Sequence, residues 1–182
     1  MKTLDELMQP DVRTLRFTPL SLSLQGTMRP EDSFAFIQGR LETTHLDPKV
    51  PEDLRKQFDT IRSLHVYGFF VYEFFTIAFS QALFLLEEAL KLSFAEQNPG
   101  ENPPRDLKRL FIWATEAGAG PLARITQIAS QEQLDALRQL RNEFAHPSRP
   151  TILTPINSAE LIKCCVLLLN ALWLPSSHED TR

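Results

Sequence analysis

The sequence has 182 residues, of which 43% are hydrophobic and 23% charged, with a formal net charge of -4 and a pI near 5.6. This length and composition are typical of one globular domain with a real hydrophobic core. An acidic chain is not expected to coat nucleic acid non-specifically, but a local basic patch can still bind phosphate, so the net charge leaves RNA open as a ligand.

The two cysteines, Cys164 and Cys165, are adjacent within an apolar run. This arrangement argues against a zinc site or a disulfide framework and favours core positions in a reducing compartment. The N-terminal residues lack the apolar core of a signal peptide, so a cytoplasmic location is expected.

Residues 1–50 are predicted to form an irregular N-terminal extension. Closely spaced prolines forbid a long helix here: Pro10, Pro19, Pro30 and Pro48. Leucines alternate with polar residues over 19–25, as in a half-buried strand, and residues 34–41 would form a second strand or a helical turn. A short β-hairpin is therefore one alternative for this region.

Residues 69–86 form the most apolar run of the chain, nearly long enough to span a bilayer. A helix is expected to begin after Pro51 and lead toward this run, and Gly68 marks a kink or a break between two helical pieces. Polar residues follow at helical spacing: Glu73, Thr76, Ser80, Glu87 and Lys91. This stripe predicts a bundle helix with one wetter face, and because a charge at the bilayer centre is costly, no membrane association is expected.

Three further helices are predicted after the turn-rich segment 97–104. Asp106 is the expected N-cap of a helix that ends near Gly118. Ser130 to Gln133 has the form of a capping box, and it opens a helix with an apolar face of Leu134, Leu137, Leu140 and Phe144.

The last helix is expected over 159–174, with Asn157 and Glu160 at capping-box spacing. Together these elements predict an all-α fold, an antiparallel four-helix bundle over 51–175, with residues 176–182 as a disordered tail. No metal-ligand motif or phosphate-binding glycine loop is visible, so neither a metal nor a cofactor is expected.

The candidate active site lies at the end of the third helix, where Arg141, Asn142 and His146 precede Pro147. Asn142 and His146 are four residues apart and would share a helix face. Histidine can move a proton near neutral pH, arginine offers a permanently charged fork for phosphate, and asparagine can orient an oxygen. The set suits metal-independent attack of an RNA 2′-hydroxyl on the neighbouring phosphate.

Spacing alone is not diagnostic, since Arg40 and His45 are also five positions apart. Arg40 lies in the irregular region and has no asparagine after it, whereas Arg141 ends an amphipathic helix. In that context, the segment Leu140-Arg-Asn-Glu-Phe-Ala-His-Pro147 resembles the signature of the HEPN superfamily, in which arginine, four to six residues and histidine follow one another. The order of helices over roughly 65–174 is also similar to that family.

The resemblance implies a helical bundle that dimerises so that the motifs of two chains meet. Many HEPN domains are metal-independent endoribonucleases in toxin–antitoxin or other defence systems, so the resemblance implies RNA as substrate, a homodimer and an antitoxin as a further partner. Arg141 and His146 would be catalytic, with Asn142 as the accompanying polar residue.

Several neighbouring residues are candidates for supporting roles. Glu73, Glu87 or Glu88 would supply the acidic group that some members carry on the preceding long helix, or would be ordinary surface or interface residues. Arg138 and Arg149 flank the motif and would contact RNA, or would be solvated surface arginines. The alternative function is a catalytically silent HEPN module that binds a nucleotide or a protein partner.

Overall fold

The computed structural model describes residues 3–16, 27–116, 121, 131–145 and 152–173. Within these ranges the chain is helical and has no β-strand, which confirms the all-α fold class. The elements are α1 (Leu4–Leu7), the 3-10 turn η1 (Thr14–Arg16), α2 (Pro30–Gly39), α3 (Glu52–Tyr67), α4 (Phe74–Gln97), α5 (Leu107–Ala114), α6 (Gln131–Ala145) and α7 (Pro155–Trp173).

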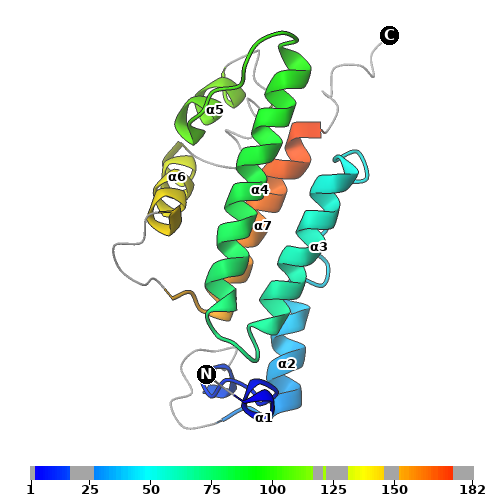
Figure 1. Cartoon of the computed structure of the whole chain (residues 1–182), viewed down its shortest axis with the longest axis vertical. Helices are drawn as coiled ribbons and strands as arrows, with labels where there is room; N and C mark the ends of the chain where they lie inside the picture. Colours follow the sequence, from blue (N-terminus) through cyan, green and yellow to red (C-terminus); the bar gives the residue numbers. More distant parts are fainter. Residues whose placement is uncertain (1–2, 17–26, 117–120, 122–130, 146–151, 174–182) are drawn as a thin grey trace.

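Helix α4 is the centre of the bundle, and α3, α5, α6 and α7 pack around it (Figure 1). Its apolar residues recur so densely that most of its circumference is buried, including Phe75, Phe79, Leu83, Leu86 and Leu90. Burying one such side chain contributes about 1.5–3 kcal/mol, so a helix apolar on most sides is stable only when neighbours cover it.

The direction of the helices is more mixed than the predicted antiparallel arrangement. Helices α4 and α7 begin at the same end of the bundle, where the Ser158 hydroxyl donates to the Phe75 carbonyl at 2.7 Å. Figure 1 shows the two helices side by side and running the same way. The reason is that the chain returns through α6 to the end of the bundle where α4 began.

Residues 30–50, predicted as part of an irregular extension, pack into the bundle. Residues 30–39 form helix α2, so of the two alternatives for 34–41, a strand or a helical turn, the helical one is correct. Pro30 sits in the first turn of α2, where its missing N–H costs no hydrogen bond. Leu41 and Val50 join the main core, and Ile37 packs with Phe69 and Phe75 in a smaller cluster. The proposed hairpin strand at 19–25 and the tail at 176–182 lie outside the described residues.

The start of α7 differs from its predicted cap. The Thr154 hydroxyl accepts a hydrogen bond from the Asn157 amide at 3.1 Å, and Pro155 occupies the first turn. The predicted capping box at Asn157 is therefore wrong, because a threonine followed by proline offers the earlier start. At α5 the prediction is confirmed, since the Asp106 carboxylate accepts from the Arg109 amide at 2.8 Å.

Helix α7 is long and apolar enough to cross a membrane by length and composition, the one such helix in the described ranges. In the structure it packs along α4 and buries residues that include Ile162, Cys165 and Leu169. The run 69–86, considered above as a span, is not one helix, because residues 68–73 form turns between α3 and α4. Burial raises the pKa of the Cys165 thiol, which fits the predicted core position.

At the break between α3 and α4, the packing leaves no room for a side chain at Gly68. A Cβ atom built on this glycine would lie 2.5 Å from the Cε1 atom of Phe75, whose ring is fully buried. The backbone of Gly68 has an ordinary right-handed helical conformation, so lack of space and not torsion requires glycine here. The sequence marked the position as a kink or break, and the structure gives the cause.

We expect Gly68→Ala to destabilise the fold by about 1–3 kcal/mol, because the new methyl group overpacks the Phe75 ring. Gly39→Ala is the matched control, since a Cβ there meets nothing within 4 Å in a helical setting. The control should be neutral or more stable by up to about 1 kcal/mol. Urea unfolding of both variants measures the difference, and equal stabilities would contradict this account of Gly68.

Candidate functional site

The predicted site is positioned by the second half of α6, which lies against α4. Leu134 and Leu137 are buried, and Phe144 packs its ring edge-on against Phe79 of α4, with the ring centroids 5.6 Å apart. This face is the predicted apolar one, and it fixes the rotation of α6. Arg141 is thereby turned toward α4, and Asn142, next along the helix, is exposed.

Arg141 is paired with Glu87 of α4. The arginine Nε and Nη2 atoms lie 2.9 and 2.8 Å from Oε2 of Glu87. The other carboxylate oxygen, Oε1, accepts from Nζ of Lys91 at 2.6 Å. Each oxygen of one carboxylate is thus bound by a different cation.

This triad of Glu87, Lys91 and Arg141 differs in exposure from one member to the next. The Glu87 side chain is 7% exposed, whereas those of Arg141 and Lys91 are 27% and 38% exposed. The arginine guanidinium also lies over the Phe84 ring, 5.8 Å from its centroid. Glu87 uses two of the five guanidinium N–H groups, so Arg141 keeps donors for a ligand.

Of the three acids proposed as supporting residues, Glu88 is exposed, and Glu73 and Glu87 are placed differently. Glu87 contacts the motif arginine, whereas Glu73 lies at the start of α4 and pairs with Arg13 at 2.8 Å. Burial is the largest single effect and opposes ionisation of Glu73, but the hydrogen bond from Arg13, a backbone hydrogen bond and the charge of Arg13 together outweigh it and lower the pKa of Glu73. Fourteen residues of helix, about 21 Å, separate the two acids, so only Glu87 belongs to this site.

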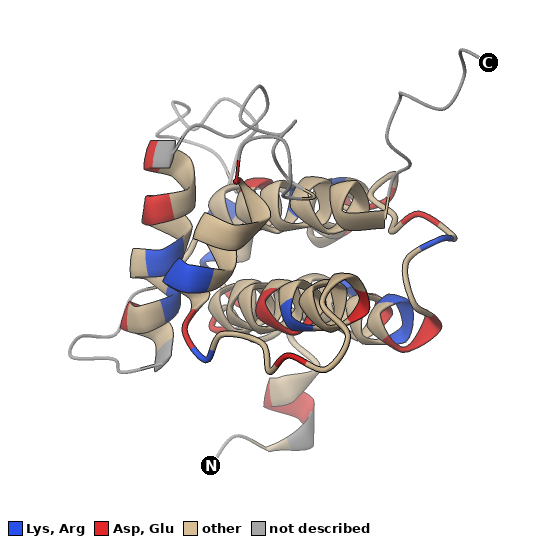
Figure 2. Ribbon diagram, turned by 90° about the horizontal axis from the view of Figure 1, so that it is seen from above, with Lys and Arg blue, Asp and Glu red and all other residues tan. Residues whose placement is uncertain are grey.

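Of the other predicted site residues, the structure describes the side-chain contacts of Arg138 but not those of His146 and Arg149. Arg138 pairs with Asp135 one turn earlier on α6, at 3.4 Å. Figure 2 shows that α6 is acidic at its start and carries its arginines further along. His146 and Arg149 lie outside the described residues, and His146 directly follows the last residue of α6.

The polar stripe of α4 is only partly exposed. Thr76 accepts a hydrogen bond from the Leu153 amide, and Glu87 is buried against α6. The prediction that this stripe is the wetter face is therefore wrong for Glu87, whereas Glu73 is exposed and Thr76, Ser80 and Lys91 are half-buried. Ile77, Phe84 and Leu92 are also exposed on α4, with exposures of 42%, 37% and 40%, between the exposed polar residues Gln81 and Glu88.

Lys91 is the site residue that the motif itself does not indicate. It belongs to the polar stripe, and its position four residues after Glu87 is the spacing of a helical ion pair. That spacing predicts the Glu87–Lys91 contact. It does not show that Arg141 would approach the same carboxylate from another helix.

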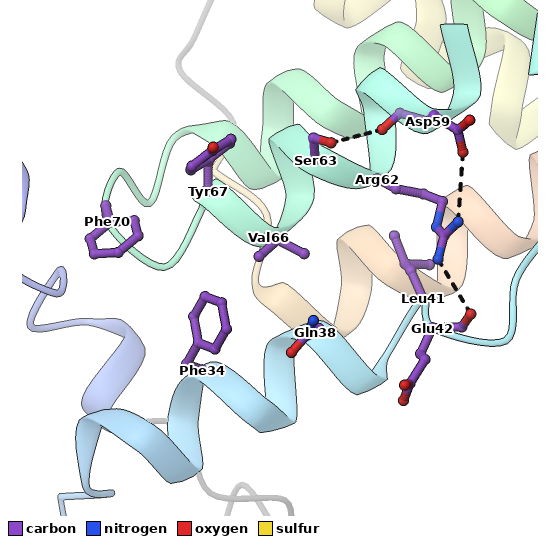
Figure 3. A pocket seen from close by; sticks show the side chains of 10 residues that line it. All are labelled: Phe34, Gln38, Leu41, Glu42, Asp59, Arg62, Ser63, Val66, Tyr67 and Phe70. Carbon is purple, nitrogen blue, oxygen red and sulfur yellow. Dashed lines mark hydrogen bonds and ion pairs between the residues drawn. The ribbon is translucent and has the colours of Figure 1, made fainter. Parts of the chain in front are cut away.

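A separate groove of about 510 Å³ opens between α2 and α3 (Figure 3). Phe34, Tyr67 and Phe70 surround one end, and Arg62 lies at the other, beside Asp59. The cation is already paired with that acid at 3.6 Å, so the groove suits an amphipathic ligand better than an anion. Figure 1 shows that α2 and α3, which line the groove, lie on the other side of α4 from α6.

Outside the motif, His65 of α3 is fully buried between α4 and α7. Its ring packs against Phe75, and its Nδ1 atom lies 3.3 Å from the Ser158 hydroxyl oxygen. Because that hydroxyl donates to the Phe75 carbonyl, His65 must donate through Nδ1–H, and the unprotonated Nε2 has no hydrogen-bond partner among the described residues. Burial, with smaller effects of Arg40 and Lys163, lowers the pKa of His65 to about 4.

We expect His65 to make the fold sensitive to mild acid. In the unfolded chain this histidine has its ordinary pKa of about 6.5, whereas in the folded chain its pKa is about 4. The free energy of unfolding therefore decreases as the pH falls through this interval, by about 3 kcal/mol in total. His65→Gln removes this titration, so its urea midpoint should change less between pH 7 and pH 4.

The control for His65→Gln is His45→Gln, which alters an exposed histidine in the segment between α2 and α3. This variant should keep the pH dependence of the unaltered chain. If the urea midpoints of His65→Gln and the unaltered chain change equally with pH, His65 is not the cause of the acid sensitivity.

The motif and the helix order remain the carriers of the family resemblance. No protein-family model matches the sequence, and no significant match was found among curated proteins or solved structures. Within the described residues no group of three or more His, Cys, Asp or Glu side chains is placed to hold a metal ion.

Proposed function

We propose that the protein is a metal-independent endoribonuclease of the HEPN type, acting as a toxin or defence component with an antitoxin as a partner. The observation that carries this proposal is the placement of Arg141. It lies at the α4–α6 seam, oriented by Glu87 and partly exposed, in the turn of α6 that leads to His146. An oriented guanidinium with unused donors is the group that a phosphate transition state requires.

In the proposed reaction the RNA 2′-oxygen attacks the adjacent phosphorus, and the bond to the 5′-oxygen breaks. His146 removes the 2′-hydroxyl proton or protonates the leaving oxygen. Arg141 stabilises the charge on the non-bridging oxygens, and Asn142 orients the phosphate. The products are a 2′,3′-cyclic phosphate and a 5′-hydroxyl end.

The test is cleavage of single-stranded RNA by the purified chain in the presence of EDTA. We expect 2′,3′-cyclic phosphate ends, detected by mass spectrometry, and a decrease of about 10²–10⁴-fold in His146→Ala, because a general acid–base group is lost. His45→Ala is the matched control, since it alters the second arginine–histidine pair of the same spacing. Equal cleavage by the chain and its His146→Ala variant would rule out this mechanism.

The proposal includes a homodimer, which the exposed face of α4 supports. Ile77, Phe84 and Leu92 recur at intervals of seven and eight residues and so lie along one side of the helix. Phe84 also lies beneath Arg141, which joins this apolar stripe to the motif. A second copy docked here would cover the stripe and bring two motifs together.

We expect the double variant Ile77→Asp/Leu92→Asp to be folded and monomeric, because charge is introduced on the apolar stripe without changing Phe84 or Arg141. Leu167→Asp is the control, since Leu167 is a similarly exposed leucine on α7. Light scattering after size exclusion gives the masses. A dimer that survives in the double variant, or is lost in the control, would refute this interface.

A second candidate function is a catalytically silent module that binds a nucleotide or a protein partner. It is favoured by the burial of Glu87, because a buried acid needs the arginine for stability whether or not RNA is cleaved. The two functions differ in the role of His146. The silent module is supported if the unaltered chain does not cleave RNA and if the unaltered chain and His146→Ala bind the same nucleotide or protein partner equally well.

A further inference from the structure

The triad contains more positive charge than its own carboxylate requires. Glu87 is a single buried acid, and Arg141 alone makes two short contacts to one of its oxygens. Lys91 nevertheless binds the other oxygen at 2.6 Å. The three side chains together carry a net charge of +1 when all are ionised.

A surplus charge in a partly enclosed position is stabilised by an anion. The Lys91 and Arg141 side chains are each more than half covered by the protein, so solvent screens them incompletely. Lys91 uses one of its three N–H donors on Glu87, and Arg141 also has donors to spare. Both cations can therefore bind a common anion without leaving the carboxylate.

No other acid of the described residues forms an ion pair with Lys91 or Arg141. Asp135 is engaged by Arg138, at 3.4 Å. Glu88 follows Glu87 on α4 and is exposed, and no ion pair joins it to Lys91 among the described residues. Beneath Arg141, Phe84 offers an apolar surface instead of a competing acid.

We propose that Lys91 and Arg141 form a phosphate-binding subsite, with Glu87 as the positioning residue that orients both cations. The inference rests on the proposed function in taking its ligand to be a phosphodiester group of a single-stranded RNA. Phe144, near the end of α6, lies beside Phe79, whereas Arg141 lies beside Glu87, so Lys91 is on the side of Arg141 away from the end of α6. The RNA strand therefore follows the contact between α4 and α6 from the end of α6 toward Lys91.

The experiment measures binding of a fluorescein-labelled single-stranded RNA of about 12 nucleotides to the His146→Ala chain, which prevents cleavage. Fluorescence anisotropy is recorded between about 50 and 200 mM salt. Lys91→Gln removes the charge and keeps a donor for Glu87. It should weaken binding about tenfold and reduce the slope of log K against log salt by about 0.7, as expected for one lost phosphate contact.

Lys56→Gln in the same background is the matched control. Lys56 forms the same kind of pair with Glu52, four residues earlier on α3, at 2.8 Å, but both partners are exposed and no arginine joins them. This variant should retain the affinity and the salt slope. Lys91→Arg should restore both, and thermal unfolding verifies that every variant is folded.

Competition with uridine monophosphate distinguishes an RNA strand from a free nucleotide as the source of the phosphate. Lys91-dependent binding of the nucleotide alone would support the subsite and assign it to a mononucleotide. If Lys91→Gln and Lys56→Gln bind RNA and nucleotide equally, or if neither ligand binds the parent, the subsite is refuted.

The RNA-binding experiment and the ribonuclease test can each fail without the other. Lys91-dependent binding by a chain that does not cleave RNA would uphold the subsite and refute the proposed activity. Cleavage by a chain whose RNA binding is independent of Lys91 would do the reverse.

Discussion

The fold depends on the burial of the apolar surface of α4 by the helices around it. This helix is apolar on most of its circumference, and each exposed leucine or phenylalanine would forgo about 1.5–3 kcal/mol. Helices α3, α5, α6 and α7 supply the cover. The position of every candidate functional residue on α6 follows from the way that helix packs onto α4.

Covering α4 also buries one of its acids. Glu87 is taken out of water, and a buried carboxylate is tolerated only when cations and hydrogen bonds compensate its lost hydration. Arg141 and Lys91 provide that compensation from two different helices. The contact that stabilises the bundle is therefore also the one that orients the motif arginine, which is why a structural and a catalytic role for Arg141 rest on the same geometry.

Two regions of the described structure suit different ligands. The α4–α6 seam has partly exposed cations and suits an anion. The groove between α2 and α3 has aromatic residues at one end, and at the other end lies Arg62, which already forms an ion pair with Asp59. An anion would therefore bind between α4 and α6 in preference to the groove, and in the proposed homodimer the exposed residues Ile77, Phe84 and Leu92 would contact a second copy.

The sequence by itself determined the helices from α3 to α7 and much of the core, but not α2. Apolar spacing marked Leu134 and Leu137 as buried, and Asp106 was identifiable as a cap, because these features depend on residues within one or two turns. The tertiary structure decided that Glu87 and not Glu73 meets Arg141, that Ile77, Phe84 and Leu92 of α4 are exposed, and that α7 runs parallel to α4. These features depend on how each helix is rotated and placed against the others, and that is set by contacts between residues far apart in the chain.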